Sequence, residues 1–330
     1  MQSLTIDPPL PFLVRPGPVG VALIGCGGTG SHLAYALARL AVHAQAEGMD
    51  LSLLFIDGDT VDAANVGRQL FSPAEIGRNK AETLAERLNA ALGLAIGSVA
   101  QMADRVVLRD CARTWRDSTI RILVGAVDTV GARAELAAAL QLGAWDLWLD
   151  CGNHEFAGQV VLGSTAHQTA LQRALALPGV CAALPSPAMQ LPGLVAALPA
   201  APATLDCAAA QIANAQSLMV NQLMAAIASQ YCYDLIIRRR IEIMATAIDC
   251  RTLTMRSTPI TAQTLAPFLP PLPPGITAAD FLAGTRAWHE DDVDDDPDDD
   301  GATDPTDPFG VLEAEEEDEG VEDDDELIPA

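Results

Sequence analysis

The stretch from 19 to 69 constrains the fold of this chain more than any other part of it. An apolar run, 19–24, leads into a glycine-rich turn that reads GCGGTG. A run compatible with a helix follows, and a second apolar run, 51–56, ends at Asp57. Strand, glycine turn, helix, strand and acidic residue in this order are the layout of a nucleotide-binding βαβ unit.

The glycine turn predicts where a phosphate would bind. Gly25, Gly27 and Gly30 satisfy the GxGxxG spacing, and Gly28 is an additional glycine. Small residues let backbone N–H groups approach a phosphate at the start of a helix, where the helix dipole favours negative charge. A tight turn in a packed βα unit is the plain alternative. Asp57 is placed to accept hydrogen bonds from both ribose hydroxyls, which predicts a nucleotide without choosing between a nicotinamide and ATP.

The polar connection after the second predicted strand favours ATP. It carries Asn65, Arg68 and Gln69, and Lys80 follows it. A guanidinium and an ammonium can neutralise the β and γ phosphates and assist the departure of pyrophosphate. A dehydrogenase has no need of these residues beyond the second strand, although any single base is equally compatible with a solvated surface position.

A carboxylate at a second strand end completes the predicted site. Asp128 follows the apolar run 120–127, which we expect to be a strand beside the glycine turn. At such a position a carboxylate can hold the Mg²⁺ that bridges the phosphates of ATP.

At these residues the chain resembles the ThiF/MoeB/HesA family, which is related to eukaryotic ubiquitin-activating enzymes. The resemblance covers about 19–164 and is carried by GCGGTGS, FIDGDTVDAANVGRQ, IGRNKAETL and GAVDTVGAR. It implies that Asp57 binds ribose, that Arg68 and Lys80 bind phosphates, and that Asp128 binds magnesium. The other matching polar positions are Asp59, Asn65 and Gln69.

The resemblance implies a reaction. Such enzymes use ATP and Mg²⁺ to adenylate the C-terminal carboxylate of a small ubiquitin-like protein, and some relatives then pass the acyl group to a cysteine thiol. Two alternatives stay open: a non-catalytic nucleotide-binding scaffold of the same family, and an NAD-dependent oxidoreductase. The C-terminal half, with its QSLMVNQLMAAIA stretch, resembles the ThiF-family protein of the bacterial PRTRC system.

Three features depart from the family pattern. Relatives often receive a second arginine from an N-terminal helix of a partner subunit, but the arm here is short and proline-rich, and Arg15 is its only base. A homodimer therefore stays open. Paired CxxC motifs, which bind zinc in some relatives, are absent from the sequence. No strong motif marks a catalytic cysteine.

Cys207 is the candidate nucleophile, because it follows a proline-rich stretch and begins a predicted helix, whose N-terminus would lower the thiol pKa. Cys181 is the second candidate. Either is equally compatible with a small buried apolar residue, and Cys26 fits best as a tolerated small residue in the turn. A groove for the tail of the partner protein is expected after 145–150, lined by Cys151, Asn153 and His154.

The alternation of strands and helices predicts an α/β fold: a Rossmann-like, mostly parallel sheet with helices on both faces. A C-terminal helix and hairpin, at 207–238 and 241–258, are expected to complete it. The predicted segments are an extended arm (1–18), the ThiF-type ATP-binding domain (19–164), a proline-rich crossover (165–206), the helix and hairpin segment (207–289) and a disordered acidic tail (290–330).

The charge is concentrated at the C-terminal end. The net charge is −25, but 22 of the 44 acidic residues lie in 290–330, which has no Lys or Arg. The remainder, with 22 acidic and 19 basic residues, is nearly neutral and lacks the basic face of a nucleic-acid binder. We expect no membrane span and a reducing cytoplasm, since the cysteines are scattered and odd in number. The tail is expected to raise solubility, or alternatively to dock a basic partner.

Overall fold

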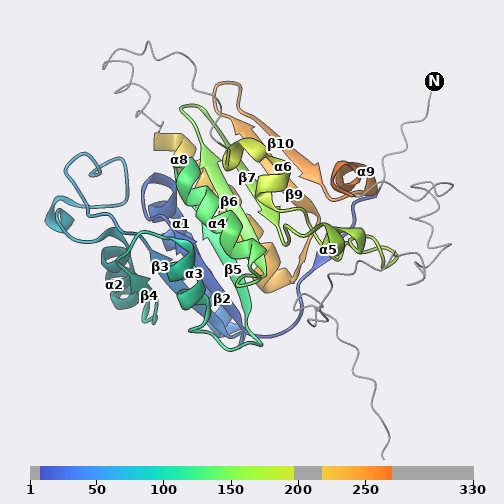
Figure 1. Cartoon of the computed structure of the whole chain (residues 1–330). Coiled ribbons are helices and arrows are strands. Elements are labelled where there is room, and N and C mark those ends of the chain that lie inside the picture. The colour runs from blue at the N-terminus through green and yellow to red at the C-terminus, as the bar shows by residue number, and fades with distance from the viewer. Residues whose placement is uncertain (1–7, 197–217, 270–330) are drawn as a thin grey trace, which may run out of the picture. The chain divides into compact units, whose positions relative to one another are not determined.

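The computed structural model describes residues 8–196 and 218–269 (Figure 1). The predicted acidic tail and the candidate nucleophile Cys207 lie outside the described residues. An eight-stranded sheet organises the described part, with the strand order β10-β9-β7-β6-β5-β2-β3-β4. Its strands are β2 (Val19–Ile24), β3 (Leu51–Ile56), β4 (Gly97–Val99), β5 (Ile120–Gly125), β6 (Leu147–Asn153), β7 (Ala157–Gly163), β9 (Ile243–Asp249) and β10 (Thr254–Pro259).

The sheet is mixed but mostly parallel, which confirms the predicted fold class. Strands β4, β3, β2, β5 and β6 run parallel, whereas β7, β9 and β10 are antiparallel to their neighbours. After β2 the chain builds β3 and β4 on one side, and it then returns to place β5 on the other side. The connections from β2 and β5 therefore diverge, and ligands of open α/β sheets bind in the crevice that such a switch point leaves.

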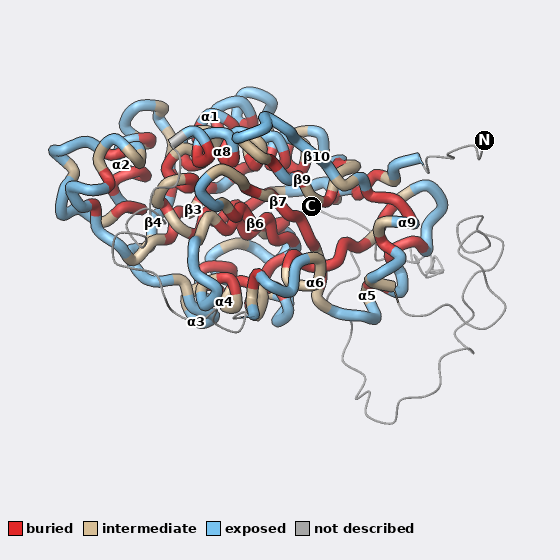
Figure 2. Tube along the Cα trace, turned by 90° about the horizontal axis from the view of Figure 1, so that it is seen from above, coloured by how far each residue is buried: buried red, intermediate tan, exposed pale blue. Residues whose placement is uncertain are grey.

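Helices cover both faces of this sheet (Figure 2). Helices α1 and α8 lie over one face, and α3 and α4 lie over the other. The longer helices are α1 (Gly28–Ala46), α2 (Lys80–Leu92), α3 (Arg105–Ala112), α4 (Val130–Gln141) and α8 (Leu218–Tyr233). Short ones are α5 (Gln168–Gln172), α6 (Pro187–Gln190), α9 (Ala262–Leu265), a π-helical turn (Asp234–Arg238) and 3-10 turns at Pro73–Glu75, Pro192–Leu194 and Ala266–Phe268.

Strand β2 shows how the apolar run creates two cores. All six of its residues are buried, which is the pattern of a central parallel strand covered on both faces. Val21 and Leu23 belong to the large core beneath α1 and α8, whereas Ala22 and Ile24 belong to the smaller core beneath α3 and α4. The period of two residues in a strand sends alternate side chains to opposite faces. An apolar run without polar alternation therefore requires helices on both sides.

Strand β5 ends at Gly125, two residues earlier than the sequence predicts. Beyond it, the Ala126 N–H donates to the carbonyl of Ile24, and a Cβ on Gly25 would lie 2.7 Å from the Ala126 oxygen. The chain segments that follow β2 and β5 thus pass in direct contact at the switch point. Asp128 therefore lies on the loop that follows β5 and not at the strand end.

The C-terminal hairpin forms as predicted and joins the main sheet, since β9 pairs with β7 and β10 pairs with β9. The N-terminal arm is extended at β1 (Phe12–Leu13), which pairs with β8 (Arg240–Ile241). The described part of the proline-rich crossover is irregular, with only short helices. None of the described helices is long and apolar enough to cross a membrane.

Candidate nucleotide-binding site

The four glycines of the turn differ in why each position needs, or does not need, a residue without a side chain. Gly25 adopts φ +86°, which disfavours other residues, and packs on the loop after β5. A Cβ on Gly30 would lie 1.8 Å from the Gly25 oxygen, and one on Gly28 would lie 2.6 Å from Nδ2 of Asn221. Gly27 alone among them has room, because its nearest neighbour would be Nε2 of Gln69 at 3.7 Å. Gly27 is therefore the position where another molecule can approach the backbone.

Helix α1 starts at this turn with its first N–H groups uncapped. Gly27 is the N-cap residue, and no side chain among the described residues caps the helix. Ser31 lies within the first turn, where its hydroxyl donates to the Gly28 carbonyl at 3.2 Å and accepts from the Leu70 N–H at 3.1 Å. Orphan N–H groups and the positive end of the helix dipole together favour an anion here.

The Asp57 carboxylate lies directly beside the glycine turn. It follows β3 and accepts hydrogen bonds from the backbone N–H groups of Cys26 (2.6 Å) and Asp59 (2.8 Å). Burial raises the pKa of this carboxyl above its ordinary value, while the two backbone donors and the charge of Lys80 act in the opposite direction. Each oxygen is fixed by one backbone donor and retains a lone pair for a ribose hydroxyl.

Lys80 is held at the same edge by the start of α2. It is only 7% exposed, and its Nζ lies 3.0 Å from Oδ2 of Asp59. Asn79 caps α2 by accepting from the Glu82 N–H, and its Nδ2 donates to the carbonyls of Asp57 (2.8 Å) and Asp59 (3.0 Å). Asn79 thus fixes Lys80 relative to the carboxylates. Sequence reasoning missed Asn79, although an Asn before a helix-compatible run is an N-cap signal.

The connection between β3 and α2 carries Asn65 and Arg68 and brings Gln69 to the glycine turn. Asn65 is buried and exchanges two hydrogen bonds of 3.0 Å with Asp62, and its carbonyl accepts from the N–H groups of Arg68 and Gln69. Asn65 therefore shapes the turn that presents its neighbours. The Gln69 Oε1 is buried without a hydrogen-bond partner among the residues that the structure describes. The Nε2 of the same amide is the nearest neighbour of Gly27, so the unpaired oxygen belongs to a side chain at the turn and is a polar atom available to a ligand.

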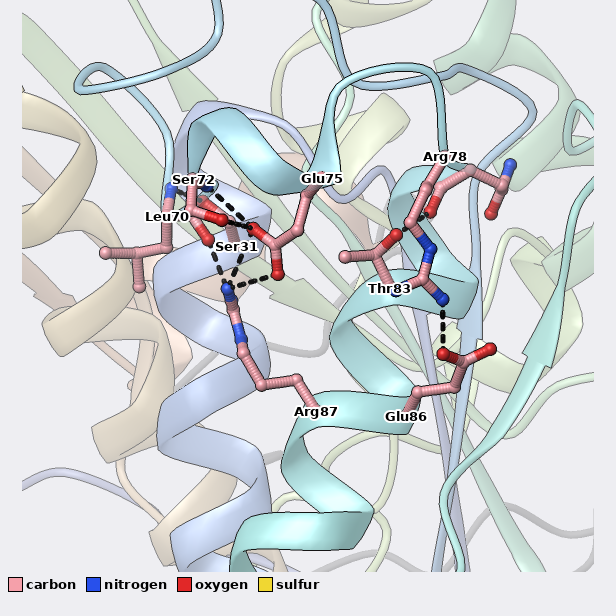
Figure 3. A network of polar contacts seen from close by, with 9 residues as sticks. Ser31, Leu70, Ser72, Glu75, Arg78, Thr83, Glu86 and Arg87 are labelled. Atoms are coloured by element: carbon pink, nitrogen blue, oxygen red, sulfur yellow. Dashed lines mark hydrogen bonds and ion pairs between the residues drawn. The ribbon is translucent and has the colours of Figure 1, made fainter.

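A polar network ties this connection to the helices on either side (Figure 3). Arg87 of α2 donates to Glu75 at 2.9 Å and to the carbonyl of Leu70 at 2.7 Å. Glu75 accepts in addition from the N–H of Ser72 at 2.7 Å, and the Leu70 N–H reaches Ser31 of α1. Leu70 follows Gln69 directly, so the network positions the end of the connection that faces the glycine turn.

Replacing Arg87 with alanine is expected to lower nucleotide affinity about ten-fold with a loss of folding stability near 1 kcal/mol, since two backbone-positioning contacts are lost from a half-exposed side chain. Arg78→Ala is the matched control, because Arg78 pairs with Glu86 on the same helix at an exposed position away from Leu70. Calorimetric titration with ATP and urea unfolding measure the two effects. Equal effects of both substitutions on affinity would contradict the positioning role of Arg87.

Asp128 lies three residues beyond β5, exposed, at the entrance to α4. Thr129 is the N-cap of α4 and accepts from the Ala132 N–H at 3.1 Å. In the parts of the chain that the structure describes, no three His, Cys, Asp or Glu residues converge on a metal site. A single carboxylate fits Mg²⁺ when substrate phosphates and water supply the other ligands, which is the usual arrangement for this ion.

The structure adds residues that sequence reasoning did not assign to the turn. Asn221 of α8 accepts hydrogen bonds from Nδ2 of Asn153 and from Oγ1 of Thr29 at 3.3 Å. Asn153, the last residue of β6, contacts the glycine turn through Thr29, and its expected place in a groove for the partner's tail stays a prediction. His154 is exposed in the following turn. No local pattern marks Asn221, because its partner Thr29 is 192 positions away.

The described candidate thiols are buried. Cys26 and Cys151 are 0% and 2% exposed, and burial raises the pKa of both well above the ordinary value. Burial also raises the pKa of Cys181 to about 12, and its thiol donates to the Ala183 carbonyl at 3.1 Å. These surroundings disfavour a thiolate at all three positions. Cys151, expected at the lining of a groove, is part of the main core.

A buried ion pair lies under the same edge of the sheet. Arg133 of α4 places its Nε 3.2 Å from both carboxylate oxygens of Asp150, which is fully buried in β6. Burial raises the pKa of Asp150 from 3.8 to about 6, against the opposing effect of Arg133. Because the folded-state pKa is raised, the free energy of unfolding falls as the pH rises from about 4 to about 6.

Replacing Arg133 with methionine is expected to cost about 3–5 kcal/mol of folding stability at pH 7, because it leaves a buried charge unpaired. The pKa of Asp150 should then move further upward, so that the loss is smaller at pH 5. Urea unfolding at the two pH values measures this difference. Arg109→Met, at an exposed pair with Asp110, is the control and should show no such dependence on pH. An equal loss at both pH values would show that Asp150 is not the responsible group.

Comparison with known proteins places the chain in a family. Among solved structures, PaaA is 18% identical with a TM-score of 0.47, and E. coli MccB with succinimide is 16% identical with a TM-score of 0.47. Each alignment covers 74% of this chain and 64% of the other, so the chain spans less than two thirds of these structures. No curated protein sequence matches it. The ThiF family matches residues 18–264, and the chain therefore belongs to the ThiF family.

Proposed function

We propose that this chain uses ATP and Mg²⁺ to adenylate the C-terminal carboxylate of a small ubiquitin-like protein. One observation carries the proposal: the open Gly27 turn at the uncapped start of α1, the anchored Asp57 carboxylate and the buried Lys80 lie at one edge of the sheet. A ribose acceptor, a phosphate cradle and a buried cation are the parts that an ATP site needs.

Each residue has a role in this proposal. Asp57 accepts the ribose hydroxyls, and the N–H groups at Gly27 face the phosphates. Lys80 and Arg68 neutralise the phosphates from the side of α2 and of the connection that precedes it. Asp128 would hold Mg²⁺ together with phosphate oxygens, and the ion would supply further charge neutralisation.

The proposed step needs little covalent chemistry from the protein. A carboxylate oxygen of the partner attacks the α-phosphorus of ATP, and the bond between that phosphorus and the bridging oxygen breaks. Pyrophosphate leaves with the electron pair, and an acyl-adenylate forms. The carboxylate is already ionised at neutral pH, so no base is required. Positioning and charge neutralisation therefore account for the catalysis.

Three finer points belong to the proposal. Transfer of the acyl group to a thiol is assigned to Cys207, because the second candidate, Cys181, is buried with a raised pKa. A homodimer would supply the second arginine that the N-terminal arm lacks. Membership of the PRTRC-type branch of the ThiF family rests on the resemblance of the C-terminal half.

ATP–pyrophosphate exchange tests the proposed activity. The full chain is incubated with ATP, Mg²⁺ and labelled pyrophosphate, with and without purified β-grasp proteins that end in Gly-Gly. Exchange that depends on one partner and on its terminal carboxylate is the expected result. ATP binding without exchange across the panel would overturn catalysis in favour of a nucleotide-binding scaffold. NAD binding in place of ATP would favour an oxidoreductase.

A further inference from the structure

Asn221 brings a distant part of the chain to the glycine turn. It lies on α8, which packs beside α1 over the same face of the sheet, and it is only 1% exposed. Its Oδ1 accepts two hydrogen bonds, from Nδ2 of Asn153 and from the hydroxyl of Thr29. These two donors determine the orientation of the amide, since an amide oxygen and not its nitrogen must face them.

The other end of the same amide is a donor without an acceptor. Within residues 8–196 and 218–269, no hydrogen bond is made by Nδ2 of Asn221. This nitrogen would lie 2.6 Å from a Cβ on Gly28, so it lies directly beside the first turn of α1. The Asn221 residue is only 1% exposed, so a donor nitrogen with no hydrogen-bond partner among the described residues, beside the helix N-terminus, points to a ligand acceptor.

We propose that Asn221 is part of the phosphate-binding site and that its Nδ2 donates a hydrogen bond to a phosphate oxygen of the bound nucleotide. The inference rests on the proposed function, because it assumes that a nucleotide binds at this turn. The groups that meet next to Gly28 are donors, namely the uncapped N–H groups of α1 and the amide nitrogen of Asn221. A polyanion matches donors alone, whereas a peptide tail would also bring N–H groups that need acceptors.

The substitution Asn221→Asp tests the amide nitrogen separately from the amide oxygen. The carboxylate keeps an oxygen where Oδ1 accepts from Asn153 and Thr29, and it replaces only the donor that faces Gly28. Negative charge is favourable at an uncapped helix N-terminus, so the folded state should keep its stability. The phosphates of a nucleotide, in contrast, would meet a carboxylate. Gln222→Glu is the matched control, because it makes the same chemical change at the adjacent, exposed position.

Calorimetric titration of the full chain with adenosine, AMP, ADP and ATP in the presence of Mg²⁺ is the experiment. We expect Asn221→Asp to weaken ATP binding at least about ten-fold, to leave adenosine binding within two-fold, and to leave the melting temperature unchanged or higher. Gln222→Glu should resemble the wild type throughout. Asn221→Ala adds no charge, so it should weaken ATP binding less than Asn221→Asp. If the aspartate variant does not fold, Asn221→Ala provides the test.

The outcomes separate this inference from the function on which it rests. Equal weakening of adenosine and ATP, or unchanged ATP binding, in a folded Asn221 variant would overturn the role of Asn221 while leaving the nucleotide site in place. A wild-type chain that binds none of the four ligands would overturn the proposed function itself. A lowered melting temperature together with equally weakened binding of all four ligands would show that Asn221 is a packing residue only.

Discussion

Replacing Asp128 with alanine is expected to lower the rate of ATP–pyrophosphate exchange at least about 100-fold, with the unfolding temperature unchanged. Asp128 is exposed on the loop after β5, so its side chain contributes little to the folded state. It is also the carboxylate at the switch point that fits Mg²⁺ bound between protein and phosphates. Removing it would leave the charge that develops on the departing pyrophosphate less neutralised.

Asp117→Ala is the control for this prediction. Asp117 lies just before β5, whereas Asp128 lies just after it, so the two residues are at opposite ends of the strand. Asp117 is exposed, as Asp128 is. Exchange should be unaffected in this variant, although its ion pair with Arg121 is lost. Wild-type exchange in the Asp128 variant, measured at saturating Mg²⁺ and again at limiting Mg²⁺, would show that this carboxylate does not take part.

The second large effect concerns two glycines only three residues apart. Gly30→Ala is expected to prevent folding, with a loss above about 4 kcal/mol. Its Cβ would lie 1.8 Å from the backbone oxygen of Gly25, a distance that no rotation of a side chain can relieve. Gly25 cannot yield, because it packs against the backbone of Ala126. Expression of soluble protein and circular dichroism provide the measurement.

Gly27→Ala is expected to fold normally and to lose at least about ten-fold in ATP affinity. Gly27 has φ −82°, and its Cβ would meet only Nε2 of Gln69, at an ordinary contact distance of 3.7 Å. The added methyl group would occupy the space through which a phosphate reaches the first N–H groups of α1. Unchanged ATP affinity in a folded Gly27 variant would move the phosphate site away from this turn.

Local patterns predicted the elements that form the site's framework. Two unbroken apolar runs became β2 and β3, with the glycine turn after the first of them. These elements depend on residues that are close together in the sequence, so a local pattern is enough to predict them. The same holds for the strand and helix alternation that predicted a mostly parallel sheet. Strand ends were less predictable, since β5 stops at Gly125 although the apolar run continues to Val127.

The burial of the candidate thiols could not be predicted from the sequence. Cys181 was expected in an irregular crossover, where exposure is common, but its backbone N–H donates to the Pro11 carbonyl and its side chain lies in the main core. The pKa of a thiol depends on what surrounds it in space. Helix periodicity and composition contain no information on which distant segment covers a loop.

The sequence by itself determined that a nucleotide-binding βαβ unit is present and which charged residues accompany it, because spacing along one unit sets both. Only the tertiary structure decided which glycine leaves room for a ligand, that Arg87 positions the connection, and that Asn221 reaches Thr29 across 192 positions. Those contacts join helices over one face of the sheet. They follow from how the elements pack, and packing is a property of the whole chain.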